Sequence, residues 1–345
     1  MRGRNLTSGC LLAIGVAVWL ATTPVAAQTP AASRASAPAG RASSVPRTPD
    51  GRPDLQGVWD FRTITPMQRP TELGGKEVLT DQEAAEFEVK NQRNQDNREA
   101  APAGIVNGQA SNADVERAYN DFWWDFGKKI VATKRTSLVI DPSDGRIPDL
   151  TPEAQKRAAA RREARERPAF GPEDRGVGER CILGFNAGPP MAPSAYNNNV
   201  QLVQTRDYVV IHNEMVHNAR IVPLTGQAHG RLAQWNGDSR GRWDRDTLVV
   251  ETTRFSGETA FGNSSPTLQL TERFTRVDAD TLIYEFTVND PTTWTKPWTA
   301  QVPMTRSDER MFEYACHEAN YGMTNLLKGA RFIEKEAPTG NKSSR

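Results

Sequence analysis

A short pattern that recurs in the C-terminal half restricts the fold of this chain most. Residues 242–251 read RWDRDTLVVE, residues 276–285 read RVDADTLIYE, and residues 305–314 are a weaker copy. Each copy combines a strand end, an Asp-containing turn and a strand rich in β-branched or aromatic residues, and residues 200–214 have the same form without the motif. Successive hairpins of this kind predict an antiparallel meander. Such a sheet avoids exposed edges most simply by closing into a barrel.

The N-terminus has the pattern of an export signal. Residues 1–27 combine a positively charged start, an apolar run over 11–20 and small residues at the predicted cleavage site. The run is too short for a membrane anchor and Pro24 follows it, while Cys10 lies before the run, which disfavours a lipoprotein signal. We therefore predict a periplasmic or secreted protein without integral membrane association. Residues 28–47 lack large apolar side chains, which predicts a disordered leader.

Signal cleavage removes Cys10 and leaves Cys181 and Cys316. In an oxidising compartment this pair predicts one disulfide, with two buried free thiols as the alternative. Neither cysteine has the spacing of a zinc site. The formal net charge of +1 gives no electrostatic reason to expect nucleic-acid binding.

The remaining chain, 48–335, suits a single domain in which helices pack outside the barrel, followed by a flexible tail over 336–345. A strand over 55–61 carries Trp59, which we expect to anchor the core. Capping patterns and apolar spacing predict helices at 79–99, 114–129 and 151–167. The fold class expected is thus mainly β, with two or three N-terminal helices.

The chain resembles a largely uncharacterised family of secreted bacterial proteins of about this length. The resemblance covers most of the mature chain and rests on segments such as GVWDFRTITPMQRP, NEMVHNARIVPL, GDSRGRWDRDTLVVET and YACHEANYGM. It implies no particular activity. More loosely, Gly57-Val58-Trp59 at the start of a β-meander resembles the G-x-W opening of lipocalin-like barrels. This second resemblance implies a fold and not a function.

Histidines and carboxylates supply the candidate chemistry. The histidines are His212, His217, His229 and His317. Strand alternation places one set of side chains on a polar face: Glu251, Glu285, Glu313 and His317. It places another set on the apolar face: Leu282, Tyr284, Phe286, Phe312, Tyr314 and Cys316. If the polar face lines the lumen, these groups form a site; if it faces water, they are solvated side chains.

On the first interpretation we assign candidate catalytic roles to Glu214, His217, Glu313 and His317. The candidate ligand-binding residues are Arg220, Glu251, Glu285 and Glu318. We expect no metal and no cofactor. A metal alternative needs His217 and His317 to meet Glu214 or Glu318. The connection 185–199, rich in Gly, Pro and Asn, either rims a cavity or is a plain loop.

Three functions remain open on the sequence alone. The leading hypothesis is a secreted barrel that holds a partly apolar or aromatic small molecule in a cavity lined by Glu and His. The second is a cofactor-free lyase, hydratase or isomerase that transfers protons on the same barrel. The third is a structural protein of the cell envelope. If Glu214, His217, Glu313 and His317 point into one enclosed volume, the first two hypotheses gain support. If these side chains are scattered over the outside, both are weakened.

Overall fold

The computed structural model describes residues 45–94, 125, 127–258, 261–262, 264–318 and 320–336, and the backbone of 95–100, 105–106 and 109–110. Contacts divide the chain into two units, 1–39 and 40–345, and every described residue belongs to the second. The predicted signal peptide, most of the predicted leader and the tail beyond 336 lie outside the described residues. So does the predicted helix over 114–129, except at 125 and 127–129, which are not helical.

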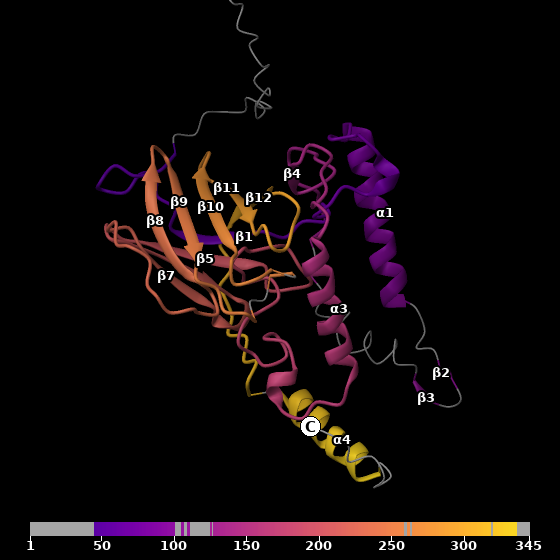
Figure 1. Cartoon of the computed structure of the whole chain (residues 1–345). Coiled ribbons are helices and arrows are strands. Elements are labelled where there is room, and N and C mark those ends of the chain that lie inside the picture. The colour runs from indigo at the N-terminus through magenta and orange to yellow at the C-terminus, as the bar shows by residue number, and fades with distance from the viewer. Residues whose placement is uncertain are drawn as a thin grey trace, which may run out of the picture. The chain divides into compact units, whose positions relative to one another are not determined.

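The structure is mainly β, as the sequence predicts, and its centre is a 10-stranded antiparallel sheet (Figure 1). The strand order is β7-β6-β5-β1-β12-β11-β10-β9-β8, with β4 paired to β12. The bounds are β1 Gly57–Asp60, β4 Val139–Asp141, β5 Asn199–Gln204, β6 Tyr208–Asn213, β7 Ala219–Pro223, β8 Asp238–Asp244, β9 Thr247–Thr253, β10 Gln269–Arg276, β11 Thr281–Asn289 and β12 Trp298–Ser307. A separate hairpin joins β2 (Ile105–Val106) to β3 (Gln109–Ala110).

Strand β1 joins two meanders that are each continuous in sequence. Strands β5 to β7 form one meander and β8 to β12 form the other, and β1 pairs antiparallel with both β5 and β12. Trp59 lies on this central strand and is completely buried. Its indole Nε1 donates to Leu55 O at 2.9 Å, and the guanidinium of Arg276 lies 5.2 Å from its ring centroid. These contacts fit the predicted role of Trp59 as a core anchor.

The described part of the chain contains three α-helices: α1 Asp81–Ala100, α3 Pro152–Glu166 and α4 Tyr321–Glu336. The predicted capping box opens α1, because Glu83 N donates to Thr80 Oγ1 at 3.2 Å and Thr80 N donates to Glu83 Oε2 at 2.9 Å. Thr151 caps α3 as expected. Helix α4 was not anticipated. Among the described residues, no helix has the length and apolar character needed to cross a membrane.

The barrel expectation is met only in part. No hydrogen-bonded ladder joins β7 to β8, so pairing does not close the described sheet into a barrel. The two end strands nevertheless approach through side chains. A Cβ placed on Gly241 of β8 would lie 2.9 Å from Val222 Cγ1 of β7 and 2.5 Å from Leu224 Cδ2. Gly241 therefore permits this close approach because it has no side chain of its own.

The apolar face of the strands points inward and builds the core. On β11 the buried side chains are Leu282, Tyr284, Phe286 and Val288, and Glu285 lies on the opposite, outer face. The largest fully buried side chains of the core include Trp59, Phe61, Phe274, Tyr284, Phe286 and Trp298. The polar face is thus the outer one, and the interpretation that it lines a lumen is corrected. Burial of the aromatic face is favoured by roughly 25 cal/mol per Å² of apolar surface.

The third copy of the repeat does not form a second strand. Strand β12 ends at Ser307, and residues 308–315 have no regular secondary structure. Ser307 pairs with Val58 near the beginning of β1, so the chain leaves the sheet where its neighbour begins. The alternation inferred for Glu313, Tyr314 and His317 therefore does not apply. We call residues 308–320, which connect β12 to α4, the C-terminal strap.

Candidate functional site

A pocket of about 690 Å³ lies beside the C-terminal strap. The polar lining includes Arg62, four carboxylates and three consecutive asparagines, and Tyr196 and Tyr314 supply aromatic surface. The complete lining is Arg62, Asp125, Gly178, Glu179, Cys181, Tyr196, Asn197, Asn198, Asn199, Glu214, Glu309, Tyr314, Ala315, Cys316 and Asn320. Segments distant in sequence thus converge on one volume that is large enough for a small molecule.

Covalent and ring contacts attach the strap to the body of the protein. Cys316 forms a disulfide with Cys181, with 5.7 Å between the Cα atoms, which confirms the predicted pairing. The ring of Tyr314 stacks on Tyr196, with centroids 6.2 Å apart and planes inclined by 22°. The side chain of Asn320 donates to Glu179 O at 2.9 Å. One wall of the pocket is therefore fixed by a cross-link between two residues that are 135 positions apart in the sequence.

Glu214 joins the strap to the sheet and is only 4% exposed. Its Oε2 accepts from Asn199 Nδ2 at 2.9 Å, and its Oε1 accepts from the backbone N of Phe312 at 3.1 Å. Glu214 follows β6 and precedes the 3₁₀ turn η4 (Met215–His217). Gly184 lies directly against the Met215 side chain, so the loop that carries Cys181 packs on this turn. The turn thereby holds the carboxylate at the pocket wall.

His217 and Glu313 lie next to each other, but neither of them lines the pocket. His217 Nε2 lies 3.9 Å from Glu313 Oε1, and the two side chains are 41% and 74% exposed. The end of β6 turns His217 away from the strand, because Val216 and His217 have φ of 50° and 51°. His212, half-buried on β6, has a lowered pKa because burial and nearby His217 both disfavour its protonated form. Glu214 and His217 thus lie against the strap, of which Glu313 is part.

The other candidate residues lie elsewhere. His317 and Glu318 are exposed in the turn after Cys316 and do not line the pocket. Glu251 is exposed on the outer face and pairs with Arg242 at 3.0 Å, whereas the outward Glu285 accepts from Gln301 at 3.4 Å. Arg220 is buried in the core. The strand register that turns Arg220 inward also turns Glu251 and Glu285 outward, so the structure does not gather these residues.

Arg220 belongs to a buried network between the two meanders. Its Nη1 and Nη2 donate to the two carboxylate oxygens of Glu272 at 2.7 and 2.8 Å. Tyr284 Oη donates to Glu272 Oε1 at 2.8 Å and accepts from Met191 N at 3.1 Å. Burial is the main cause that raises the pKa of Tyr284 well above its ordinary value, so its hydroxyl keeps its proton. We interpret this network as part of the core scaffold because its charges are paired.

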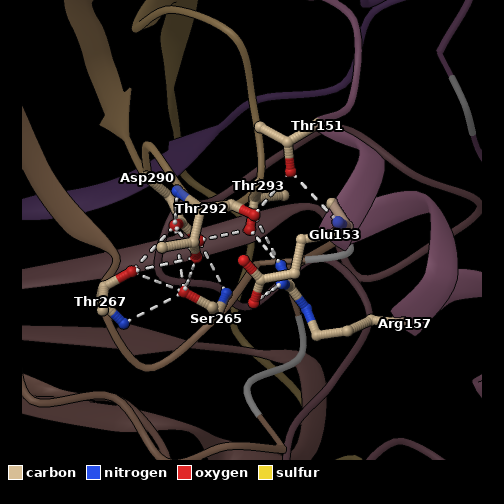
Figure 2. A network of polar contacts seen from close by, with 9 residues as sticks. Thr151, Glu153, Arg157, Ser265, Thr267, Asp290, Thr292 and Thr293 are labelled. Carbon is tan, nitrogen blue, oxygen red and sulfur yellow. Dashed lines mark hydrogen bonds and ion pairs between the residues drawn. The ribbon is translucent and has the colours of Figure 1, made fainter.

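A second polar network surrounds Asp290, at the end of β11 (Figure 2). The carboxylate is 2% exposed and accepts from backbone and hydroxyl donors of Ser265, Thr267, Thr292 and Thr293. Burial alone would raise the pKa of Asp290, but these hydrogen bonds outweigh it and lower the pKa. Arg157 of α3 donates to Thr292 O at 3.1 Å and to Thr293 Oγ1 at 2.9 Å. The network therefore connects α3 to the chain after β11.

The fourth histidine pairs with a carboxylate away from the pocket. His229 Nδ1 lies 3.2 Å from Asp238 Oδ2, and Arg240 Nη1 donates to Asp238 Oδ1 at 2.5 Å. Burial raises the pKa of Asp238, yet hydrogen bonds from Gly230 N and Arg240 more than offset this and lower the pKa. Neither His229 nor Asp238 lines the pocket. This pair connects the 226–236 loop to the start of β8.

Within the described residues, no three His, Cys, Asp or Glu side chains are arranged to hold a metal ion. His217, His317, Glu214 and Glu318 thus do not form the set that the metal alternative requires. Comparison with protein-family models, curated proteins and solved structures finds no match for this chain. The site must therefore be interpreted from its own geometry.

Sequence reasoning missed several residues of the pocket. Tyr196 and the three asparagines that follow it end the 185–199 connection, for which a cavity rim was one of two interpretations. The run Asn197-Asn198-Asn199 is the signal that would have favoured that interpretation, because amide side chains recur in polar binding sites. Arg62 and Glu309 gave no such signal. Their place in the lining depends on contacts between distant segments.

Proposed function

We propose that this protein is exported from the cytoplasm and binds a partly aromatic small molecule in the pocket beside the C-terminal strap. The observation that carries the proposal is the composition of this pocket. Its volume of about 690 Å³ is within the range typical of small-molecule sites, and its lining combines two tyrosine rings with amide and carboxylate groups. The disulfide at its wall reduces the conformational freedom of the strap before a ligand binds, which favours affinity.

Export is supported by the signal-like pattern over residues 1–27 and by the disulfide, since disulfides persist in oxidising compartments. The proposed destination is the periplasm or the extracellular medium. We also propose that the fold is a lipocalin-like relative within a family of secreted bacterial proteins. The support is the G-x-W strand at the centre of the sheet and the close approach of the Val222 side chain to the backbone of Gly241. In this proposal side-chain packing substitutes for hydrogen bonds between β7 and β8.

Native mass spectrometry of protein purified from its own host tests the binding function. We expect wild-type protein to carry a bound small molecule, and Tyr314→Ala to lose it because the variant removes half of the stacked pair. Tyr321→Ala is the matched control, since Tyr321 is 73% exposed on α4 and does not line the pocket. A wild-type protein without any bound mass, or equal retention by both variants, contradicts the proposal.

A second candidate function is a cofactor-free lyase, hydratase or isomerase. The observation that favours it is the approach of His217 Nε2 to Glu313 Oε1 at 3.9 Å. Imidazole and carboxylate are the usual groups for proton transfer near neutral pH. His217→Gln separates the two functions. If the protein is an enzyme, His217→Gln should retain unprocessed substrate, and the mass that co-purifies with it should differ from that of wild type. If the protein only binds its ligand, the same mass should co-purify with His217→Gln and with wild type.

A further inference from the structure

We infer that the ligand of this pocket carries a cationic group with N–H donors, such as an ammonium, amidinium or guanidinium, and that Glu214 is its counter-ion. The inference rests on the proposed binding function and specifies the ligand class. It derives from the charges that line the pocket, from the burial of Glu214 and from hydrogen-bond acceptors that the protein leaves without donors.

The lining is strongly acidic. Four carboxylates, those of Asp125, Glu179, Glu214 and Glu309, face one cation, Arg62. That cation is already engaged, because Arg62 Nη2 lies 2.6 Å from Asp60 Oδ2 and Nη1 pairs with Asp125. The hydrogen bond to Asp60 is the largest cause of the raised pKa of Arg62. The potential in the pocket therefore favours a positive ligand and opposes an anion.

Glu214 is the carboxylate that requires a counter-ion most. It is 4% exposed, and both of its hydrogen-bond donors, Asn199 Nδ2 and Phe312 N, are uncharged. Among the described residues no Lys, Arg or His side chain makes an ion pair with it. An ionised carboxylate has about four acceptor positions, and burial without a cation is costly. A ligand cation at the pocket wall would occupy the positions that the protein leaves open.

The neighbouring groups are also acceptors. Asn199 donates through Nδ2 to Glu214, which leaves its Oδ1 buried without a donor. The stacked Tyr196 and Tyr314 present aromatic surface at the same pocket. Aromatic faces attract cations through the negative potential over the ring. A planar cation therefore fits the carboxylate of Glu214 and the rings together, whereas a neutral ring would satisfy only the rings.

Benzamidine and benzamide test the inference, because the two probes have the same size and ring but only benzamidine is charged. Isothermal titration of the full mature protein should show at least about tenfold tighter binding of benzamidine, which is about 1.4 kcal/mol. Benzoate should bind most weakly. In Glu214→Gln the preference for benzamidine should disappear. In Tyr314→Ala both probes should weaken together, since the ring contact is common to them.

Glu214→Gln is expected to fold, because the Gln oxygen still accepts from Phe312 N and the Asn199 amide can reverse to accept from the Gln nitrogen. Thermal melting checks this. Glu163→Gln, an exposed change on α3, is the matched charge control and should keep the preference.

Equal binding of benzamidine and benzamide by wild type overturns the cationic ligand but leaves the binding function intact. A preference that survives in Glu214→Gln overturns the role of Glu214. Failure of both probes overturns the inference for planar cations. The binding function is then decided separately by the mass that co-purifies with wild-type protein.

Discussion

The buried pair of Arg220 and Glu272 offers the sharpest test of the fold, through the substitution Glu272→Gln. The two side chains are 2% and 0% exposed, and Nη1 and Nη2 of Arg220 contact the carboxylate of Glu272 at 2.7 and 2.8 Å. Burial opposes the charge on Arg220, but Glu272 outweighs it and raises the pKa of Arg220. In Glu272→Gln the guanidinium therefore stays charged and faces an amide that neutralises nothing.

The expected loss of unfolding free energy is about 3–5 kcal/mol, the range for removing one partner of a buried ion pair. The lower half of the range is the better expectation, since the Gln oxygen still accepts one of the two hydrogen bonds from Arg220. Removal of both charges in Arg220→Met/Glu272→Met should cost less than Glu272→Gln alone. That comparison separates the unpaired charge from the loss of packing.

Urea unfolding of the oxidised protein, followed by tryptophan fluorescence, measures these differences. Glu285→Gln is the matched control on the next strand, because Glu285 lies on the outer face and should change stability by less than about 0.5 kcal/mol. If Glu272→Gln unfolds at the same urea concentration as Glu285→Gln, then β10 does not turn Glu272 inward. The assignment of the inner face would then be wrong.

Further predictions concern the cross-link, the first strand and the Asp290 network. Cys181→Ser/Cys316→Ser should lose up to about 4–5 kcal/mol in urea unfolding because it frees a loop closed over 135 residues of separation, and an unchanged midpoint contradicts this. Trp59→Ala should lower the free energy of unfolding by roughly 3–5 kcal/mol. Trp243 is only partly buried, so Trp243→Ala should lower it by less than half as much, and equal losses refute the anchor role. Asp290→Asn should cost about 1–3 kcal/mol at pH 7, because an amide cannot accept from all of the donors around Asp290. Because the hydrogen bonds lower the folded pKa of Asp290, the ionised carboxylate stabilises the fold above its unfolded pKa of about 3.9, and this stability is lost as the pH falls through the folded pKa. The difference in melting temperature between wild type and Asp290→Asn should therefore shrink on acidification, and a difference that does not shrink argues against the network.

Local sequence signals were sufficient for most of the sheet. The turn Asp244-Arg245-Asp246 and the alternating strands around it predict the hairpin that β8 and β9 form. Such hairpins depend on residues that are close in sequence, so turn chemistry and alternation specify them. The disulfide was predictable for another reason, since signal cleavage leaves one possible pair.

The strap and α4 were not predictable in the same way. Residues 308–314 repeat the hairpin pattern, but a strand needs a neighbour with free hydrogen-bonding groups. The partner of β12 is β1, which begins at Gly57, and Val58 already pairs with Ser307. Residues after Ser307 therefore have no β1 residues left to pair with. In α4 only Ala330 is buried, and Phe332 is 64% exposed. Apolar residues of α4 nevertheless recur at helical spacing, at Met323, Leu326, Leu327, Ala330 and Ile333, so this helix does have a signal in the sequence, one that the expected elements did not include.

The location of the candidate site depends on which sheet face points inward, and alternation alone leaves this choice open. Alternation correctly places Glu251 and Glu285 on one face and Leu282 and Tyr284 on the other. It does not tell which of the two faces points inward. Aromatic volume decides the choice, because Phe274, Tyr284, Phe286 and Trp298 must leave water and together fill the interior. Within the described residues these aromatic side chains occupy the inner face, and the pocket lies beside the strap. Glu214 is different, since it follows the last residue of β6 and is held between Asn199 of β5 and Phe312 of the strap. A carboxylate can therefore face a pocket here only because the chain after β12 crosses back over the end of β6 and is held there by Cys181.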